Sequence, residues 1–158
     1  MSGANERCAG ARSEFAERDR LCNNGSMEKK YYSGAHTKHR NMYHLVWVPK
    51  YRKKILQGKI KSKVEEILKE CSEVNGWEIQ KMNVQIDHVH MMIQIPPSMR
   101  VCDAVQTFKG VSSRIVRKEM PQEVRRMLKG PSFWADGYFC CTVGDYSEQA
   151  VLNYIQNQ

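Results

Sequence analysis

The stretch that most constrains the fold is "HVHMMIQI", residues 88–95, which ends at two prolines. In an extended chain successive side chains point to opposite faces, so odd-numbered and even-numbered positions separate. The odd-numbered face is wholly apolar: Val89, Met91, Ile93 and Ile95. The other face carries His88, His90, Met92 and Gln94. This pattern predicts a strand whose apolar face is covered by helices and whose opposite face presents two parallel imidazoles.

Three further stretches read as strands. "NMYHLVWVPKYR" (41–52) begins as a strand in which Tyr43, Leu45 and Trp47 alternate with His44, Val46 and Val48; apolar residues on both faces are typical of a central strand, and Pro49 ends it. "WEIQKMNVQI" (77–86) alternates as a second strand, and "YFCCTV" (138–143) is bounded by turn residues.

Helical spacing of apolar residues appears in three places. The first helix ends at Asn75-Gly76, a typical C-terminal stop. For the second we expect Ser98 as the cap and Gly110 at a close approach of another element. The last helix covers 145–158, while 118–137 reads as a basic, turn-rich connection with room for one short helix. The apolar stripes of the two long helices are Ile60, Val64, Ile67, Leu68 and Cys71, and then Val101, Val105, Phe108, Ser112 and Ile115.

The order β-α-β-β-α-β-α predicts an α+β fold of the ferredoxin-like (RRM-like) kind. Its antiparallel sheet has helices on one face, and a C-terminal helix is added. His88 and His90 would then lie on the uncovered face. Residues 1–26 are polar and show no hydrophobic period, so we expect a disordered N-terminal extension before a domain spanning 27–158.

Positive charge is concentrated in that domain. The net charge is +8, and residues 1–26 contain as many acidic as basic side chains. This excess favours a polyphosphate partner, while an acidic membrane surface is a weaker alternative because the cations face no aromatic stripe. No apolar run approaches the ~20 residues of a membrane helix, and we expect no membrane contact. The predicted phosphate-binding residues fall in two clusters: Lys50, Arg52, Lys53 and Lys54, and then Arg114, Arg117 and Lys118.

Two histidines one residue apart on a strand can bind one metal ion, although many such pairs are incidental. The amidohydrolase use of this pair needs a far longer barrel chain. A structural zinc site needs four ligands, usually with closely spaced thiolates. The six cysteines form no CxxC pair, and we interpret them as reduced cytosolic thiols. A third ligand must therefore come from elsewhere.

The last helix supplies a candidate. Tyr154 and Gln158 are four residues apart and share a helix face. Tyrosines so placed usually pack against the core, and terminal glutamines are usually solvated. Together with His88 and His90, however, a second interpretation is available, in which the Gln158 amide would complete a neutral three-ligand site for Mg²⁺ or Mn²⁺. Such an ion activates a phosphodiester, and Tyr154 would be the nucleophile.

Several blocks in the same order resemble one family. The blocks are "AHTKHRNMYHLVWVPKYRKKIL", "HVH", "FKGVSS", "FWADGYFCCTVG" and "YIQNQ". From about Met27 to Gln158 the chain resembles the HUH single-tyrosine transposases of the insertion sequence 200/605 type. The resemblance implies that His88 and His90 are the metal-binding histidines, Gln158 the third ligand and Tyr154 the nucleophile. We also expect the last helical turn to fray at Gln158.

The resemblance implies a DNA transposase of the prokaryotic cytosol or nucleoid that binds hairpins at element ends. Such an enzyme cleaves and rejoins single-stranded DNA through a 5′-phosphotyrosine. It also implies a homodimer in which the tyrosine helix of one subunit completes the site of the other. Two alternatives remain: a ferredoxin-like nucleic-acid-binding module, and a metal-independent RNA endonuclease with a histidine base. The RNA endonuclease would not need Tyr154.

Overall fold

The structure is a computed structural model, and it describes residues 31–34, 36–144 and 148–157. The predicted extension, residues 1–26, lies outside the described residues. The strands of the main sheet are β3 (Met42–Trp47), β4 (Glu78–Val84), β5 (Val89–Gln94) and β6 (Phe139–Thr142). The helices are α2 (Gly58–Val74), α3 (Val101–Glu119), α4 (Pro121–Met127) and α5 (Glu148–Gln156), with a 3₁₀ turn η1 (Lys50–Arg52).

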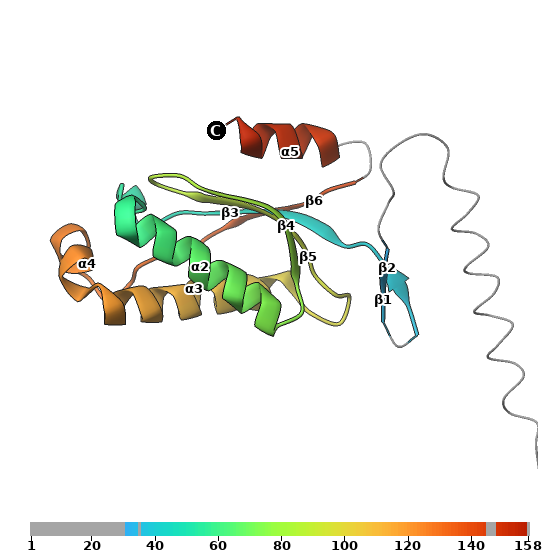
Figure 1. The fold of residues 1–158 in the computed structure, drawn as a ribbon, viewed down its shortest axis with the longest axis horizontal. Coiled ribbons are helices and arrows are strands. Elements are labelled where there is room, and N and C mark those ends of the chain that lie inside the picture. Colours follow the sequence, from blue (N-terminus) through green and yellow to red (C-terminus); the bar gives the residue numbers. More distant parts are fainter. Residues whose placement is uncertain (1–30, 35, 145–147, 158) are drawn as a thin grey trace, which may run out of the picture. The chain divides into compact units, whose positions relative to one another are not determined.

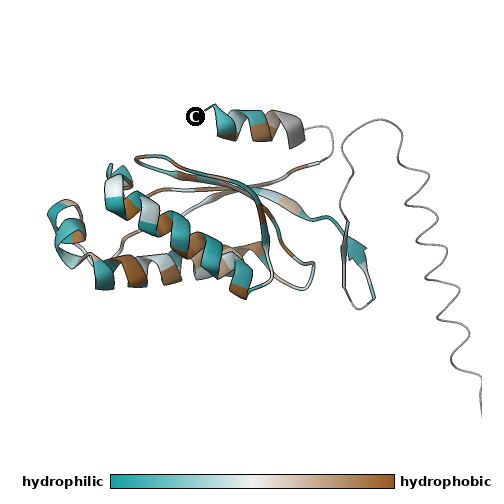
Figure 2. Ribbon diagram, viewed as in Figure 1, coloured by the Kyte–Doolittle hydropathy of each residue, from teal (hydrophilic) through white to brown (hydrophobic). Residues whose placement is uncertain are grey.

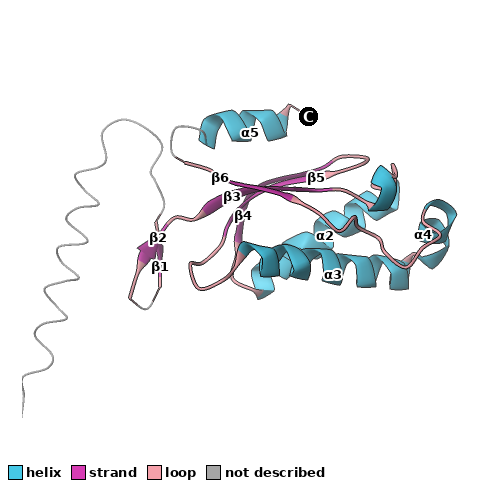
Figure 3. Ribbon diagram, turned by 180° about the vertical axis from the view of Figure 1, so that it is seen from behind, coloured by secondary structure: helices cyan, strands magenta, loops and turns pink. Residues whose placement is uncertain are grey.

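The main sheet has four strands in the order β4-β5-β3-β6, and every neighbouring pair is antiparallel. Helices α2 and α3 cover one face, and α5 lies over the other (Figure 1). The reverse view shows the same layers, with α4 beyond the end of α3 (Figure 3). The predicted α+β ferredoxin-like fold, with its added C-terminal helix, is confirmed.

The helix-covered face of the sheet carries the main core. Every residue of β5 is buried, and its odd-numbered residues, together with Leu45 and Trp47 of β3, pack against α2 and α3. Figure 2 shows brown, hydrophobic segments along these strands and alternating brown and teal along α2 and α3. Phe108 of α3 is fully buried, and its ring contacts those of Trp47 and Trp77 at centroid distances of 6.2 and 5.1 Å. The predicted division of β5 into two faces is therefore correct.

Local signals fix the ends of the two long helices. The side chain of Asn75 donates from Nδ2 to the Cys71 carbonyl at 2.7 Å, and Gly76 has φ +67°, so α2 stops where the sequence predicts. Two expectations for α3 are wrong. Its N-cap is Arg100, whose guanidinium binds Asp103 in the first turn, while Ser98 lies in the preceding turn. A methyl group added at Gly110 would meet nothing within 4 Å.

A two-stranded hairpin precedes the main sheet. It consists of β1 (Tyr32–Ser33) and β2 (Lys38–His39), and alternation could not predict it because each strand has only two residues. Among the described residues, no helix is both long and apolar enough to cross a membrane.

The aromatic cluster around Phe108 should dominate stability. Phe108→Ala removes a fully buried ring and leaves a cavity against two tryptophans, so the free energy of unfolding should fall by about 3–5 kcal/mol. The exposed Gln106 on the same helix is the control, and Gln106→Ala should change stability by less than about 0.5 kcal/mol. Urea unfolding followed by circular dichroism measures both. Equal effects of the two substitutions would contradict the placement of α3.

Candidate active site

The face of the sheet opposite α2 and α3 carries paired histidines. In the β3–β5 register Val46 lies opposite His90 and His44 opposite Met92, so His44 and His90 are diagonal neighbours. Both are buried, with 7% and 5% of their surface exposed. His44 Nε2 and His90 Nδ1 are 3.1 Å apart, and the ring planes differ by 12°. The two imidazoles are therefore joined by a buried hydrogen bond.

His88 lies immediately before β5 and belongs to a separate chain of contacts. Its Nδ1 is 2.6 Å from Asp87 Oδ1, and Arg52 Nη2 is 3.4 Å from Asp87 Oδ2. Arg52 and its neighbour Tyr51 both have positive φ, 50° and 60°, a strained conformation for residues other than glycine. The rings of His88 and His90 are 4.6 Å apart and nearly perpendicular. Both histidines thus lie at the same end of the sheet face opposite α2 and α3, which we call the open face because α5 alone lies over it among the described helices (Figure 1).

Helix α5 brings Tyr154 to this face. Ile155 is fully buried against Met42 and Met92, and its carbonyl accepts a 2.9 Å hydrogen bond from Asn83 Nδ2. Tyr154 remains 51% exposed, with its ring 5.5 Å from that of His90 and 6.4 Å from that of His44. The helix packs on the sheet of its own chain. An exchange of this helix between subunits stays a prediction.

The charges in the site follow from burial and from pairing. Burial lowers the pKa of His44, which favours a neutral imidazole. The hydrogen bond from His88 lowers the pKa of Asp87 and outweighs the opposing effect of burial, with a smaller contribution from the Arg52 charge. Asp87 is therefore a carboxylate beside His88, and His44 is a neutral partner of His90.

The residues at this end of the face fit a divalent metal in part. His88 and His90 offer two imidazoles from one strand end. Within the described part of the chain, no three His, Cys, Asp or Glu side chains are grouped so as to hold an ion. A third ligand must then be of another type or lie elsewhere, which is compatible with the predicted Gln158. That residue lies outside the described residues.

Comparison with known proteins identifies the family. The family described as "Transposase IS200 like" matches residues 37–158. The ISDra2 transposase TnpA of Deinococcus radiodurans is 33% identical over 116 residues, which cover 73% of this chain and 82% of that protein. The chain belongs to the IS200-like transposase family. The transposase for insertion sequence element IS200 of Salmonella typhimurium is 32% identical over 124 residues, covering 78% of this chain and 80% of that one.

Solved structures show the same fold. A protein from Deinococcus radiodurans R1 assigned as a transposase superposes with a TM-score of 0.66 and 28% identity, covering 80% of this transposase and 97% of that chain. A REP-associated tyrosine transposase bound to a REP hairpin gives a TM-score of 0.54 at 9% identity, covering 84% of this chain and 68% of that one. At 9% identity, the second similarity shows only that the two proteins share a fold.

The structure separates the two predicted phosphate-binding clusters of the transposase. The first, residues 50–54, follows β3 and adjoins Asp87 through Arg52, while Lys53 and Lys54 are exposed. Lys50 Nζ lies 2.9 Å from Asp136 Oδ2, a pairing that raises the pKa of Lys50. The second cluster, Arg114, Arg117 and Lys118, lies on α3 in the helix layer across the sheet, and Arg117 donates to the Gly130 carbonyl at 3.0 Å. The first cluster alone is beside the histidines.

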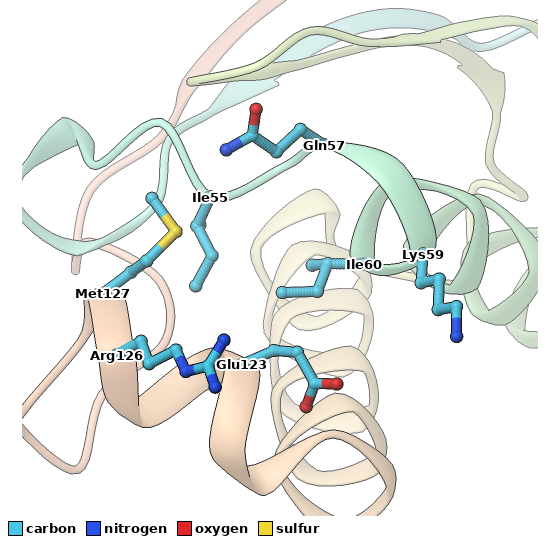
Figure 4. Close-up of a pocket in the computed structure, with 7 residues that line it drawn as sticks. All are labelled: Ile55, Gln57, Lys59, Ile60, Glu123, Arg126 and Met127. Atoms are coloured by element: carbon cyan, nitrogen blue, oxygen red, sulfur yellow. The ribbon is translucent and has the colours of Figure 1, made fainter.

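A hollow of about 290 Å³ lies elsewhere, between the start of α2 and α4 (Figure 4). None of the predicted site residues lines it. The lining residues are Ile55, Gln57, Lys59, Ile60, Glu123, Arg126 and Met127.

Sequence reasoning missed His44 as a residue of the site. Alternation along β3 places it correctly on the face opposite Leu45, but it does not reveal the neighbouring strand. Only the β3–β5 register, with His44 opposite Met92, brings its ring to His90. The available signal was that each of the two central strands, β3 and β5, carries a histidine on the face away from the helices.

The position of Tyr154 should depend on Ile155. Ile155→Ala should cost about 2–5 kcal/mol of local packing. A helix of nine residues has little stability of its own, so α5 should detach from the sheet. Hydrogen–deuterium exchange should then accelerate in peptides covering 148–157 and remain slow in 89–94. Gln156→Ala, at an exposed position, is the control. Unchanged protection of α5 in Ile155→Ala would show that Ile155 does not hold the helix.

Proposed function

We propose that this transposase binds DNA hairpins and cuts and rejoins single-stranded DNA, with Tyr154 as the nucleophile. The observation that carries the proposal is the half-exposed Tyr154 ring 5.5 Å from the ring of His90, which is itself 4.6 Å from that of His88. A phenol accessible to solvent beside two imidazoles, in an IS200-like transposase, suits attack on a phosphodiester.

The reaction is a transesterification. The Tyr154 oxygen attacks phosphorus and loses its proton, an O–P bond forms, and the P–O3′ bond breaks. The 3′ oxygen takes up a proton and leaves as a free 3′-OH, while the 5′ side stays linked to the tyrosine. Attack by a 3′-OH on the phosphotyrosine reverses these steps and rejoins a strand. The number of phosphoester bonds is unchanged, so no nucleotide hydrolysis is needed.

The first basic cluster would hold the strand near Tyr154. Arg52, Lys53 and Lys54 are exposed, and Arg52 contacts Asp87 beside His88, so phosphates can bind close to the histidines. The second cluster lies in the helix layer, and we propose that it contacts a more distant part of the DNA. Binding through such contacts should weaken as salt rises.

We propose His88 and His90 as ligands of Mg²⁺ or Mn²⁺, with Gln158 as the third ligand. When bound, the ion would act as a Lewis acid on the phosphate. Asp87 would orient His88, because its carboxylate accepts the Nδ1–H and leaves the Nε2 lone pair to face the ion. The family resemblance further supports a homodimer, which light scattering after gel filtration would test.

Two observations support the proposal that this chain recognises DNA hairpins. The family resemblance implies it, and a protein of the same fold binds a REP hairpin. Hairpin shape and unpaired bases would then supply specificity, with stacking on aromatic side chains. A non-catalytic binding module of the same fold would bind the hairpin without forming a covalent product.

Tyr154→Phe should abolish the covalent product and leave binding intact. The substitution removes one hydroxyl and keeps the ring that contacts His90. Wild-type protein mixed with single-stranded hairpin DNA and Mn²⁺ should give a protein–DNA complex that survives SDS, and Tyr154→Phe should give none. Hairpin affinity, measured by fluorescence anisotropy in EDTA, should change by less than about twofold. Wild-type cleavage by Tyr154→Phe would rule out this nucleophile.

His88→Ala and His90→Ala should each lower metal-dependent cleavage by at least tenfold without unfolding the protein. Neither side chain belongs to the main apolar core, but His90 is buried and hydrogen-bonded to His44, so His90→Ala should lower stability more than His88→Ala. His36→Ala, at an exposed position before β2, is the matched control and should behave as wild type. Loss of cleavage should be accompanied by a retained cooperative thermal transition well above room temperature. If either variant unfolds at room temperature, its histidine is a core residue and the metal proposal fails.

A further inference from the structure

We infer that His44 is a positioning residue that holds His90 in the tautomer able to bind a metal ion. The inference rests on the proposed function, since it concerns how His90 meets the ion. A neutral imidazole carries one N–H and one lone pair, on different ring nitrogens. Whichever nitrogen carries the proton in a hydrogen bond therefore decides which nitrogen can bind a metal.

The two metal-binding candidates have different partners at Nδ1. His88 Nδ1 meets Asp87 Oδ1 at 2.6 Å. A carboxylate only accepts, so His88 donates its Nδ1–H and its lone pair lies on Nε2. His90 Nδ1 meets another imidazole, His44 Nε2, at 3.1 Å. An imidazole nitrogen can donate or accept, so this contact permits two proton arrangements.

Only one arrangement suits metal binding. If His90 donates its Nδ1–H to His44 Nε2, the lone pair of His90 lies on Nε2, as in His88. If His44 donates instead, Nε2 of His90 carries a proton and cannot coordinate. The planes of the two rings differ by 12°, which suits either arrangement because N–H bonds and lone pairs lie in the ring plane. Coordination through Nε2 of both histidines therefore requires His44 to accept.

A third residue contacts the other ring nitrogen of His44, and this contact is compatible with the accepting form, although a thiol can also donate to an imidazole nitrogen. In that form His44 carries its proton on Nδ1, and Cys141 Sγ lies 4.0 Å from this nitrogen, at the limit of a weak hydrogen bond to sulfur. Cys141 is opposite His44 in the β3–β6 register. The contacts form a line from β6 through β3 to β5: Cys141, His44 and His90. Burial of His44 excludes water from the middle of that line.

Replacing a residue that orients a metal-binding histidine typically lowers metal affinity by about 10–100-fold. His44→Phe keeps a planar ring of similar size and removes the acceptor. We expect it to weaken Mn²⁺ binding, measured by isothermal titration calorimetry without DNA, by about 10–100-fold. His44→Gln offers an amide oxygen as acceptor and should recover most of the affinity. Metal-free hairpin binding should stay at the wild-type value for both variants, and both should keep a cooperative thermal transition, with a lower melting temperature for His44→Phe because the buried His90 Nδ1–H loses its acceptor.

The tautomer of His90 can be measured directly, without a bound metal and without an activity assay. In ¹⁵N-labelled wild-type protein in EDTA, two-dimensional NMR of the imidazoles should show His88 and His90 protonated at Nδ1 and unprotonated at Nε2. In His44→Phe, His90 should lose that preference while His88 keeps it. Cys141→Ala should weaken the preference of His90, and Cys140→Ala, at the adjacent position on β6, should not.

The outcomes separate this inference from the proposed function. His90 protonated at Nε2 in the wild type, or unchanged Mn²⁺ affinity and His90 tautomer in His44→Phe, would overturn the role of His44, even if the protein cleaves DNA. The predicted tautomers and their loss in His44→Phe would support that role, even if Tyr154 proved not to be the nucleophile. If His44→Phe fails to fold, the His44→Gln and Cys141→Ala spectra still decide, because the expected His90 states differ between them.

Discussion

The site depends on burying β5 on both faces. Its odd-numbered side chains pack against α2 and α3, and Met92 on the other face packs under α5 with Met42 and Ile155. A shift of one residue in the register of β5 would exchange the two faces and place His90 in the helix-packed core. The apolar contacts on the two sides therefore fix the histidines on the face that receives Tyr154.

One end of the open face packs against α5, and the other end carries the histidines of the site. Toward one end Met42, Met92 and Val143 hold α5 through Ile155. Toward the other, His44 and His90 are joined by a hydrogen bond, and Asp87 holds His88. The strained turn at Tyr51 and Arg52 brings a guanidinium to Asp87, so a basic segment that suits phosphate also supports a histidine contact. One short helix and one strained turn thus assemble groups that are distant in sequence.

Much of this arrangement was predictable from periodicity. Alternation in 88–95 gave both faces of β5 correctly, and the helical stripes located α2 and α3 because each buries one side against the sheet. The start of α3 was not predictable from Ser98, since the Arg100–Asp103 pair lies in its first turn. His44 was missed because its role depends on strand register, which a single strand does not encode. Residues 1–26 and Gln158, the predicted third ligand, remain sequence predictions.

The nucleophile can be located directly by mass spectrometry of the covalent complex formed with single-stranded hairpin DNA. After nuclease trimming and trypsin digestion, the peptide that follows Lys129 contains Tyr138, Tyr146 and Tyr154, so fragmentation can compare three tyrosines within one peptide. The geometry on the open face predicts a nucleotide attached through its 5′-phosphate to Tyr154, whose ring lies beside His90. Attachment to Tyr138 or Tyr146, or to a residue outside this peptide, would contradict the site.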